Sequence, residues 1–225
     1  MKLILAWLLA AVIGYLLGSI NSSIPVVKFF LGKDIRTLGS KNAGLTNTYR
    51  CAGKQCAAIT LAGDLLKGVI AVILARLICG GLDAGLSPDN DTHYIGYIAG
   101  LFAILGHVFP IYYNFKGGKG VLVGVSIFLV VSPKVFFALL AIFAVILALS
   151  KYVSLSSIIS SAMCPLATFL MSWIVDGCTF GRSFLYMVLS LPMAAMVIIM
   201  HRSNVQRLLK GTENRFSFKT SGIEK

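Results

Sequence analysis

Polar residues that could bind phosphate are concentrated in one stretch of this otherwise apolar chain of 225 residues. Residues 32–50, G-K-D-I-R-T-L-G-S-K-N-A-G-L-T-N-T-Y-R, combine glycines and basic residues with Ser, Asn and Thr. Between Gly39 and Asn47, glycines let the chain turn so that successive N–H groups converge, and hydroxyl and amide side chains add donors. Because Arg36 and Arg50 flank this segment, it is typical of a phosphate-binding loop. A solvated loop between two membrane helices is the alternative, but a long polar stretch without an apolar face favours function.

Two ionisable residues lie inside or next to a predicted membrane span. Asp64 and Lys67 are three positions apart in the sequence G-D-L-L-K-G. An ionisable residue within a span usually has a partner and a function. The two side chains could simply neutralise each other; alternatively, Asp64 orients a basic residue of the phosphate site. Both are candidate substrate-binding residues.

A second basic, glycine-rich segment, N-F-K-G-G-K-G, follows the sequence G-H-V-F-P at residues 106–110. Two lysines around a Gly–Gly pair at the start of a helix place ammonium and N–H groups where an anion is favoured. The segment is not a P-loop, because Gly120 stands where that motif has Ser or Thr. The candidate anion-binding residues here are His107, Lys116, Gly117, Gly118 and Lys119.

Polar residues also begin and end the last two predicted spans. The sequence Y-V-S-L-S-S at residues 152–157 could be a helix N-cap and nothing more, or could line the site. The sequence H-R-S-N-V-Q-R-L at residues 201–208 closes the last span, and Arg202 within it is a candidate substrate-binding residue. A basic tail at this place would usually be an anchor to anionic lipid. All these motifs fall on one predicted side of the membrane, which offers several phosphate sites and no obvious nucleophile.

The composition places the chain among polytopic helical membrane proteins. Its mean hydropathy is +0.87 and 12% of its residues are charged, which is outside the range of soluble proteins. The net charge of +12 therefore does not indicate nucleic-acid binding, and we expect no nucleic-acid partner. The five cysteines lack the paired spacing of metal ligands, and we expect neither a metal nor a cofactor.

Seven spans are predicted, at residues 3–20, 55–79, 94–108, 121–131, 135–149, 155–175 and 183–200. Residues 24–31 are expected to form a short interfacial helix. The first span should be retained and not cleaved as a signal peptide, because the six basic residues that follow it resist export. The fourth and fifth spans rise only about 17–23 Å against about 30 Å of hydrocarbon, so the loops at their cytoplasmic ends should line a recess. We treat residues 1–225 as a single transmembrane domain with a cytoplasmic tail from about residue 201.

The sequence Ser-Pro-Lys at residues 132–134 is either a kink within one span or a turn between two spans. With a turn, fifteen basic residues fall on one side of the membrane and three on the other, with two inside a span. A kink would place the six basic residues of the tail outside and violate the positive-inside rule. We therefore predict a turn, with the N-terminus outside and the C-terminus in the cytoplasm.

The motifs occur in an order that resembles a known family. G-S-x-N-x-G-x-T-N, G-D-x-x-K-G, G-H-x-F-P with F-K-G-G-K-G, Y-V-S-L-S-S and H-R-x-N-x-x-R-L-x-x-G-T-E-N-R-F are together similar to the acyl-phosphate-dependent glycerol-3-phosphate acyltransferases, the PlsY family. The resemblance covers residues 18–216. By motif match it implies catalytic roles for Arg50, Lys119, Ser157 and Asn204. It maps donor-phosphate binding onto Ser40, Asn42, Gly44, Thr46 and Asn47.

The resemblance also implies a reaction and a location. The expected reaction transfers a fatty acyl group from acyl phosphate to the 1-hydroxyl of sn-glycerol 3-phosphate, giving lysophosphatidic acid and inorganic phosphate. The expected location is the bacterial inner membrane, with the active site facing the cytoplasm. The expected ligands are acyl phosphate, glycerol 3-phosphate and membrane lipid. Two residues of the first motif depart from the family: Lys41 stands where Gly is usual, and Leu45 where Ala is usual.

The main alternative function is a membrane transporter of an organic phosphate. Ionisable residues within spans, Asp64, Lys67 and Arg76, would suit such a protein. However, a transporter should place polar groups near the midplane of paired repeats. This chain has no internal repeat and gathers its polar motifs on one face, which favours the acyltransferase.

Overall fold

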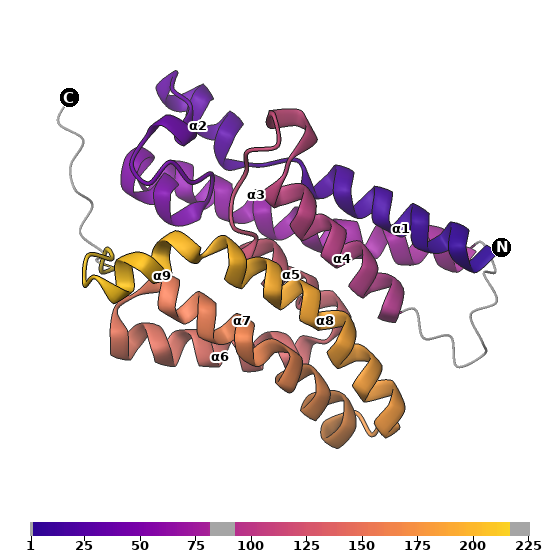
Figure 1. Ribbon diagram of the computed structural model, residues 1–225. Coiled ribbons are helices and arrows are strands. Elements are labelled where there is room, and N and C mark those ends of the chain that lie inside the picture. Colours follow the sequence, from indigo (N-terminus) through magenta and orange to yellow (C-terminus); the bar gives the residue numbers. More distant parts are fainter. Residues whose placement is uncertain (1, 82–92, 217–225) are drawn as a thin grey trace.

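The structure is a computed structural model that describes residues 2–81 and 93–216 (Figure 1). In this part of the chain every regular element is a helix. The elements are α1 (Lys2–Gly18), α2 (Ser23–Leu31), η1 (Ile35–Thr37), α3 (Leu45–Gly81), α4 (His93–Val108), η2 (Ile111–Tyr113), α5 (Val121–Val131), α6 (Pro133–Ser150), α7 (Val153–Leu170), η3 (Met171–Val175), α8 (Phe180–Met200) and α9 (Arg202–Leu209). Outside the described residues lie predicted outer-loop acids and tail lysines, namely Asp83, Asp89, Asp91, Lys219 and Lys225.

Six helices of the described residues are long and apolar enough to cross a membrane, and the apolar helix α5 adds a seventh, of 11 residues. The predicted all-α membrane fold is therefore confirmed. A short helix, α2, is present where one was predicted, and its interfacial position stays a prediction. Some predicted lengths are wrong: α6 has 18 residues where the sequence predicts 15, and α8 has 21 where it predicts 18. Pro133 occupies the first turn of α6, where the missing N–H costs no intrahelical hydrogen bond, so this helix begins earlier than predicted.

Helix α5 is too short to cross about 30 Å of hydrocarbon by itself. The last carbonyl groups of a helix accept no hydrogen bond from within that helix and need other donors. Arg76 of α3 supplies one, since its Nη1 donates to the carbonyl of Val130 at 3.3 Å. This contact gives a structural reason for a charged residue inside a span.

The chain reverses direction between α5 and α6. Ser132 has extended backbone angles (φ −153°, ψ 92°) and separates the two helices. Val121 and Leu122 at the start of α5 line the same cavity as Phe143 near the end of α6, so the two helices run antiparallel. The predicted turn is therefore confirmed. The orientation of the chain across the membrane stays a prediction.

Helices α1 and α4 pack closely because small residues line their contact. A Cβ atom at Gly14 would stand 2.2 Å from the carbonyl oxygen of Ala99. A Cβ atom at Gly18 would stand equally close, 2.2 Å, from the carbonyl oxygen of Ala103. Small residues at this spacing let two membrane helices approach until their backbones touch. Glycine at both positions therefore fixes α1 against α4.

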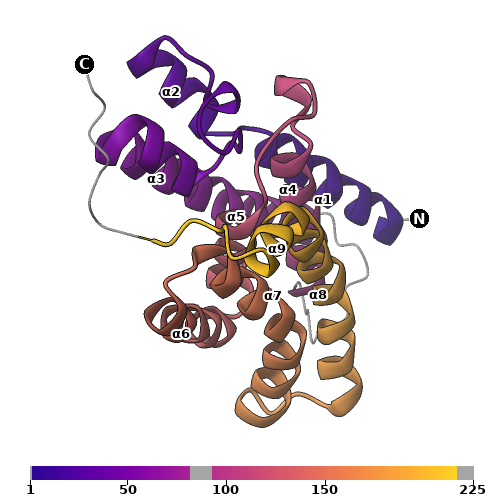
Figure 2. The same cartoon turned by 60° about the vertical axis from the view of Figure 1, so that its left-hand side comes forward.

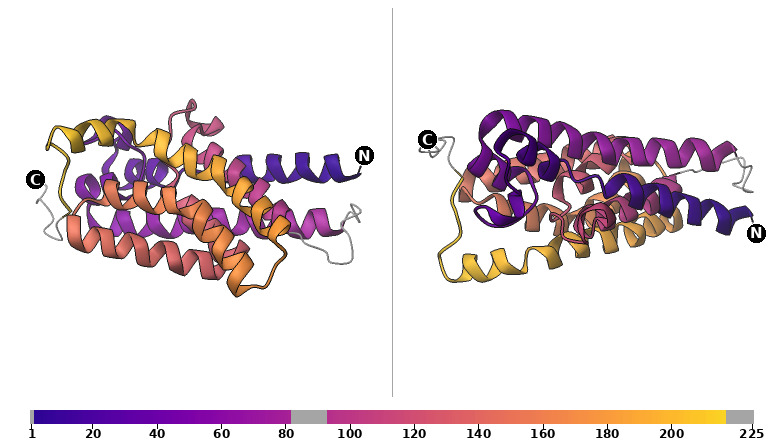
Figure 3. Two further views of the ribbon diagram at one scale, coloured as in Figure 1. Left: turned by 60° about the horizontal axis from the view of Figure 1, so that its bottom comes forward. Right: turned by 90° about the horizontal axis from the view of Figure 1, so that it is seen from above.

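The polar motifs collect at one end of the bundle. Helices α2 and α9 lie at the end opposite to the start of α1 (Figure 3). The segment after α9 runs between the side formed by α2 and α3 and the side formed by α6 and α7 (Figure 2). Its position is fixed where the N–H of Phe216 donates to the carbonyl of Lys151 at 2.7 Å. One end of the molecule thus brings together residues that are far apart in the sequence.

The polar stretch at residues 32–50 is more ordered than the predicted loop. It contains η1, and α3 begins at Leu45, so Arg50 lies on a helix. A kink at Gly53 (φ 80°) separates this first part of α3 from the long part that crosses the membrane. The expectation that the stretch has no apolar face is wrong, because Ile35 and Ala43 are buried against Val27 of α2. In the sequence these apolar residues stand singly and follow neither a helical nor a strand periodicity.

Candidate active site

A cavity of about 350 Å³ lies at the end of the bundle that carries the polar motifs. Its walls come from the first turns of α3, the starts of α5 and α7, helix α9 and the segment after it. The predicted site residues in its lining are Ser40, Asn42, Gly44, Thr46, Asn47, Arg50, Asp64, His107, Lys119, Ser157 and Asn204. Its described lining leaves out the candidates Gly39, Lys67, Lys116, Gly117, Gly118 and Arg202.

The side chain of Asn47 shapes the loop that enters α3. Its Oδ1 accepts a hydrogen bond from the N–H of Ser40 at 2.9 Å. Its Nδ2 donates to the carbonyl groups of Leu38 at 3.0 Å and Asn42 at 3.1 Å. Gly39 has a φ of 52°, and a Cβ atom there would stand 2.5 Å from Asn47 Oδ1. Asn47 therefore holds the loop in shape, and Gly39 gives it the space to do so.

The N-terminus of α3 faces the cavity. Gly44, Leu45, Thr46 and Asn47 all line it. The first N–H groups of a helix have no intrahelical acceptor, and the helix dipole makes this end favourable for an anion. The guanidinium of Arg50 lies in the next turn and faces the same space. The predicted phosphate site thus consists of a helix N-terminus and a basic residue.

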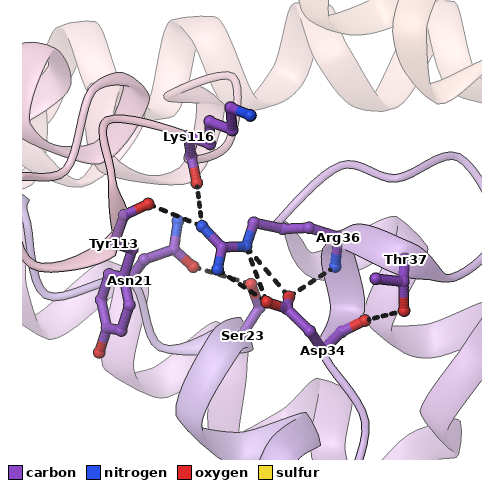
Figure 4. Close-up of polar contacts among 7 residues, drawn as sticks. All are labelled: Asn21, Ser23, Asp34, Arg36, Thr37, Tyr113 and Lys116. Carbon is purple, nitrogen blue, oxygen red and sulfur yellow. Dashed lines mark hydrogen bonds and ion pairs between the residues drawn. The ribbon is translucent and has the colours of Figure 1, made fainter.

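Arg36 contacts protein groups and does not line the cavity (Figure 4). Its Nη2 and Nε pair with the carboxylate of Asp34, at 2.7 Å for the closer contact, and hold the pKa of that carboxyl below its usual range. Its Nη1 donates to the carbonyl groups of Tyr113 at 2.7 Å and Lys116 at 3.2 Å. The prediction of Arg36 as a flanking phosphate ligand is therefore wrong. The residue joins the loop before α3 to the loop that leads to Lys119.

The Gly–Gly pair packs against the end of α4. The N–H of Gly117 donates to the carbonyl of Val108, and that of Gly118 to the carbonyl of His107, both at 3.1 Å. A Cβ atom on Gly117 would stand 1.9 Å from the His107 carbonyl oxygen. These N–H groups are therefore occupied, in contrast to the predicted anion-binding loop. The glycines allow a close approach that sets the position of Lys119.

A network of five polar side chains connects the loop before α5 with α7, α9 and the segment after α9. Lys119 Nζ donates to Asn204 Oδ1. Asn204 Nδ2 and Ser154 Oγ donate to Glu213 Oε1, at 2.7 and 2.9 Å. Arg207 Nε donates to Glu213 Oε2 at 2.7 Å. Glu213 was not among the predicted site residues, although it is the single acidic residue between positions 201 and 216, where a basic tail makes a carboxylate conspicuous.

Burial and neighbouring charges shift the pKa values of Lys119 and Glu213 in this network. Burial lowers the pKa of Lys119 to about 8, an effect that Glu213 opposes and that Arg207 and Arg50 reinforce. Burial by itself would raise the pKa of Glu213, but the hydrogen bonds from Asn204, Ser154 and Arg207 lower it below the usual value. Glu213 is thus a carboxylate, and Lys119 is mostly an ammonium at neutral pH. Around Lys119 the cavity therefore has the positive charges of Lys119, Arg50 and Arg207 beside the hydrogen-bonded carboxylate of Glu213.

His201 also lines the cavity, although it was not among the predicted site residues. Its Nδ1 lies 2.7 Å from the carbonyl of Val197, and burial lowers its pKa to about 4. The ring is therefore neutral at pH 7, donates from Nδ1 and presents Nε2 as an acceptor. Arg202, the next residue, is exposed.

An apolar cavity of about 150 Å³ adjoins the polar one. Residues of α4 to α8 line it, and the two cavities share Val121, Leu122, Phe143 and Ser157. Ser157 donates through Oγ to the carbonyl of Val153 at 2.9 Å and stands at the boundary between the two spaces. The arrangement can hold a charged group and an alkyl chain of one molecule on either side of this boundary.

Comparison with known proteins agrees with these observations. Residues 8–211 match the family model described as glycerol-3-phosphate acyltransferase. The chain belongs to this family. It is 37% identical to a glycerol-3-phosphate acyltransferase of Clostridioides difficile, covering 96% of this chain and 98% of the relative. It is 38% identical to one of Enterococcus faecalis, covering 97% and 94%.

Solved structures of the family have the same fold. A crystal structure of PlsY (YgiH), an integral membrane glycerol 3-phosphate acyltransferase, in its glycerol 3-phosphate form superposes with a TM-score of 0.74 at 32% identity. The alignment covers 94% of this chain and 96% of that one. The lysophosphatidic acid form of that protein gives the same TM-score, 0.74, at 30% identity. The protein is accordingly an integral membrane member of the glycerol-3-phosphate acyltransferase family.

Proposed function

We propose that this acyltransferase takes a fatty acyl group from an acyl phosphate and transfers it to the 1-hydroxyl of sn-glycerol 3-phosphate. The products are lysophosphatidic acid and inorganic phosphate. The observation that carries the proposal is the junction of a basic polar cavity with an apolar cavity at Ser157 and Phe143. A donor with a phosphate head and an alkyl chain fits both spaces at once, with its reactive carbonyl at the boundary.

The cavity offers two kinds of phosphate-binding group. One is the N-terminus of α3 with Arg50, and the other is Lys119 with Arg207. Two phosphorylated substrates require two such groups, and electrostatic positioning accounts for a large part of catalysis in sites of this kind. We assign Ser40, Asn42, Gly44, Thr46 and Asn47 to the wall that binds the donor phosphate.

The reaction needs little from the protein beyond positioning and positive charge. The hydroxyl oxygen attacks the carbonyl carbon of the acyl phosphate, and the C–O bond to phosphate breaks as inorganic phosphate leaves. A phosphate oxygen of a substrate can take the hydroxyl proton, since the second pKa of a phosphate ester is about 6. Lys119 and Asn204 are placed to stabilise the oxyanion and the departing phosphate. Glu213 accepts three hydrogen bonds in the network and is a poor base.

An acyl thioester is a less suitable donor. Acyltransferases that use it rely on the motif H-x-x-x-x-D, and the fifth residues after the three histidines here are Ile98, Tyr112 and Gln206. We place the reaction on the cytoplasmic side of a bacterial inner membrane, because the basic residues gather at the end of the bundle that carries the cavity. Membrane lipid around the apolar helices gives the donor a route to the apolar cavity.

The test is turnover by purified protein in lipid with labelled glycerol 3-phosphate. Palmitoyl phosphate should give labelled lysophosphatidic acid, and palmitoyl-CoA should give none. Equal rates with the thioester would contradict the assignment of the donor. Uptake of labelled glycerol 3-phosphate into vesicles without acylation would favour the transporter instead.

A further inference from the structure

A buried lysine fixes the protonation of His107. Lys67 Nζ lies 2.9 Å from Asp64 Oδ1, 2.8 Å from the carbonyl oxygen of Ile20 and 2.8 Å from His107 Nδ1. Lys67 and Asp64 are 5% and 1% exposed, so the three contacts replace water around the ammonium. An ammonium has three donors and no acceptor. The Nδ1 of His107 must therefore accept, which leaves the single ring proton on Nε2.

The ring of His107 borders the polar cavity. His107 is 4% exposed and lines this cavity. A Cβ atom at Gly118 would stand 2.2 Å from Nε2, which places that edge of the ring beside the loop leading to Lys119. Within the described part of the chain, the polar contacts of the His107 side chain with Lys67 and Asp64 both use Nδ1. Because the ring lines the cavity and Nε2 carries the proton, this N–H is a hydrogen-bond donor available to a ligand there.

The wall around His107 also presents an acceptor and carries no net charge. Asp64 lines the same cavity, and within the described part of the chain its ion pair and hydrogen bonds use Oδ1, which leaves Oδ2 available. The charges of Asp64 and Lys67 cancel, and the imidazole is neutral. The charges that act on Lys119, by contrast, are those of Glu213 and arginines. A neutral donor beside an acceptor matches a hydroxyl better than a phosphate.

We infer that His107 Nε2–H and Asp64 Oδ2 bind the hydroxyl at C2 of the acceptor's glyceryl group, and that Lys67 is a positioning residue that holds His107 in the required tautomer. The inference rests on the proposed function. The hydroxyl at C1 has to reach the acyl phosphate among the basic groups, whereas the hydroxyl at C2 does not react. A neutral wall that holds the C2 hydroxyl would turn the C1 hydroxyl towards the donor.

The test compares two acceptors, glycerol 3-phosphate and 3-hydroxypropyl phosphate, which lacks only the C2 hydroxyl. The wild-type enzyme should prefer glycerol 3-phosphate by about tenfold or more in kcat/KM, as expected for a hydrogen-bonded hydroxyl. In His107→Asn the shorter amide can still face Lys67 but cannot reach the hydroxyl, so this preference should disappear. His107→Gln places an amide donor near the position of Nε2 and should keep part of the preference.

Three outcomes would overturn the inference. One is a wild-type enzyme that uses both acceptors equally well. Another is an equal loss by His107→Asn on both acceptors, which would assign His107 to the phosphate or to the fold. The third is a change confined to the KM of the acyl phosphate. Failure of the proposed function is distinguishable, because the wild-type enzyme would then acylate neither acceptor with acyl phosphate.

The role of Lys67 has its own readout. We expect Lys67→Met to reduce the preference for glycerol 3-phosphate in the wild-type background and to have no further effect on it in His107→Asn. Nitrogen NMR of labelled histidine, with the other two histidines replaced by glutamine, should show a proton on Nε2 of His107 and a mixture of tautomers after Lys67→Met. Because that variant leaves Asp64 unpaired, the double variant Asp64→Asn/Lys67→Met tests the same shift with the buried charge removed. An unchanged tautomer in both variants would contradict the role of Lys67.

Discussion

Among single side chains, Lys119 is the one best placed to stabilise the negative charge that develops in the reaction. It is largely buried, its ammonium donates to Asn204, and it faces the cavity that adjoins the alkyl-binding space. The histidines of the cavity differ from it, because His201 is neutral and His107 has Nδ1 occupied by Lys67. Positive charge and not a protein base is therefore the expected contribution of the enzyme.

Lys119→Met should lower kcat by roughly 10²–10³, the usual effect of removing one well-placed oxyanion donor. The variants His107→Gln and His201→Gln should lower kcat by far less. The measurement is kcat for the three purified variants at saturating acyl phosphate and glycerol 3-phosphate. A histidine variant as inactive as Lys119→Met, and rescued by added imidazole, would restore a protein base to the mechanism.

The pKa of Lys119 also predicts a pH dependence. Burial lowers this pKa to about 8, so the free enzyme loses the ammonium as the pH rises through that value. We expect kcat/KM to fall above pH 8, since this ratio reports the ionisation of the free enzyme. Lys119→Arg, which stays charged, should keep a flat profile in that range even if its maximum is lower. An unchanged alkaline limb in Lys119→Arg would assign the ionisation to another group.

Lys41 provides a test of backbone strain. Its φ is 59°, a left-handed conformation that disfavours residues with a Cβ atom, and its side chain is exposed. Lys41→Gly should raise the free energy of unfolding by about 1 kcal/mol. Activity should persist, with less than a tenfold change in the KM of the donor. A loss of kcat beyond a hundredfold would instead show that the Lys41 ammonium is a phosphate ligand.

Between elements, the Arg36 guanidinium connects the loop before α3 to the loop that leads to Lys119 (Figure 4). It bonds to Asp34 in one loop and to the carbonyl groups of Tyr113 and Lys116 in the other. One ammonium cannot reproduce this planar set of donors. The Arg36 guanidinium therefore fixes the distance between the start of α3 and Lys119.

Arg36→Lys should lower kcat/KM by about tenfold or more, since each hydrogen bond to a charged group contributes about 1.5–3 kcal/mol. The loss should affect both substrates, because the loops that bind them would separate. Lys33→Met removes a positive charge from the same loop at an exposed position and serves as the control. Equal losses in the two variants would mean that Arg36 acts through its charge alone.

Across the bundle as a whole, helices α2 and α9 lie at the end opposite to the start of α1 (Figure 3). The polar cavity, whose lining includes Asn204 and Arg207 of α9, belongs to that end. The positive-inside rule predicts that this end lies in the cytoplasm. Helix α5, which is too short to span by itself, is accommodated because α3 and α4 surround it. The orientation can be measured directly.

Single cysteines on a cysteine-free background should report the orientation in spheroplasts. A cysteine at Thr179, between α7 and α8, should react with an impermeant thiol reagent in intact spheroplasts. Cysteines at Lys41 and Asn114 should stay protected until lysis. Reaction at Lys41 before lysis would reverse the predicted topology and place the cavity on the outer side.

The sequence by itself determined the class of protein, the helices and the kind of ligand. Apolar runs specify membrane helices because an unpaired backbone group is too costly in hydrocarbon. The turn at Ser132 followed from the distribution of basic residues. Most polar motif residues that could bind phosphate do line one cavity. These are local or compositional properties, which the order of residues contains directly.

Only the tertiary structure decided which polar groups are free to meet a ligand. Arg36 and the N–H groups of Gly117 and Gly118 resemble anion ligands in sequence, but protein carbonyl and carboxylate groups already occupy them. Glu213 and His201 join the site because α9 and the segment after it fold back over the start of α7. A hydrogen-bonding group has the same appearance in a sequence whether it is satisfied or not. Its availability depends on partners that can be 80 positions away, as for Arg36 and Lys116, or 85, as for Lys119 and Asn204, and only packing brings them together.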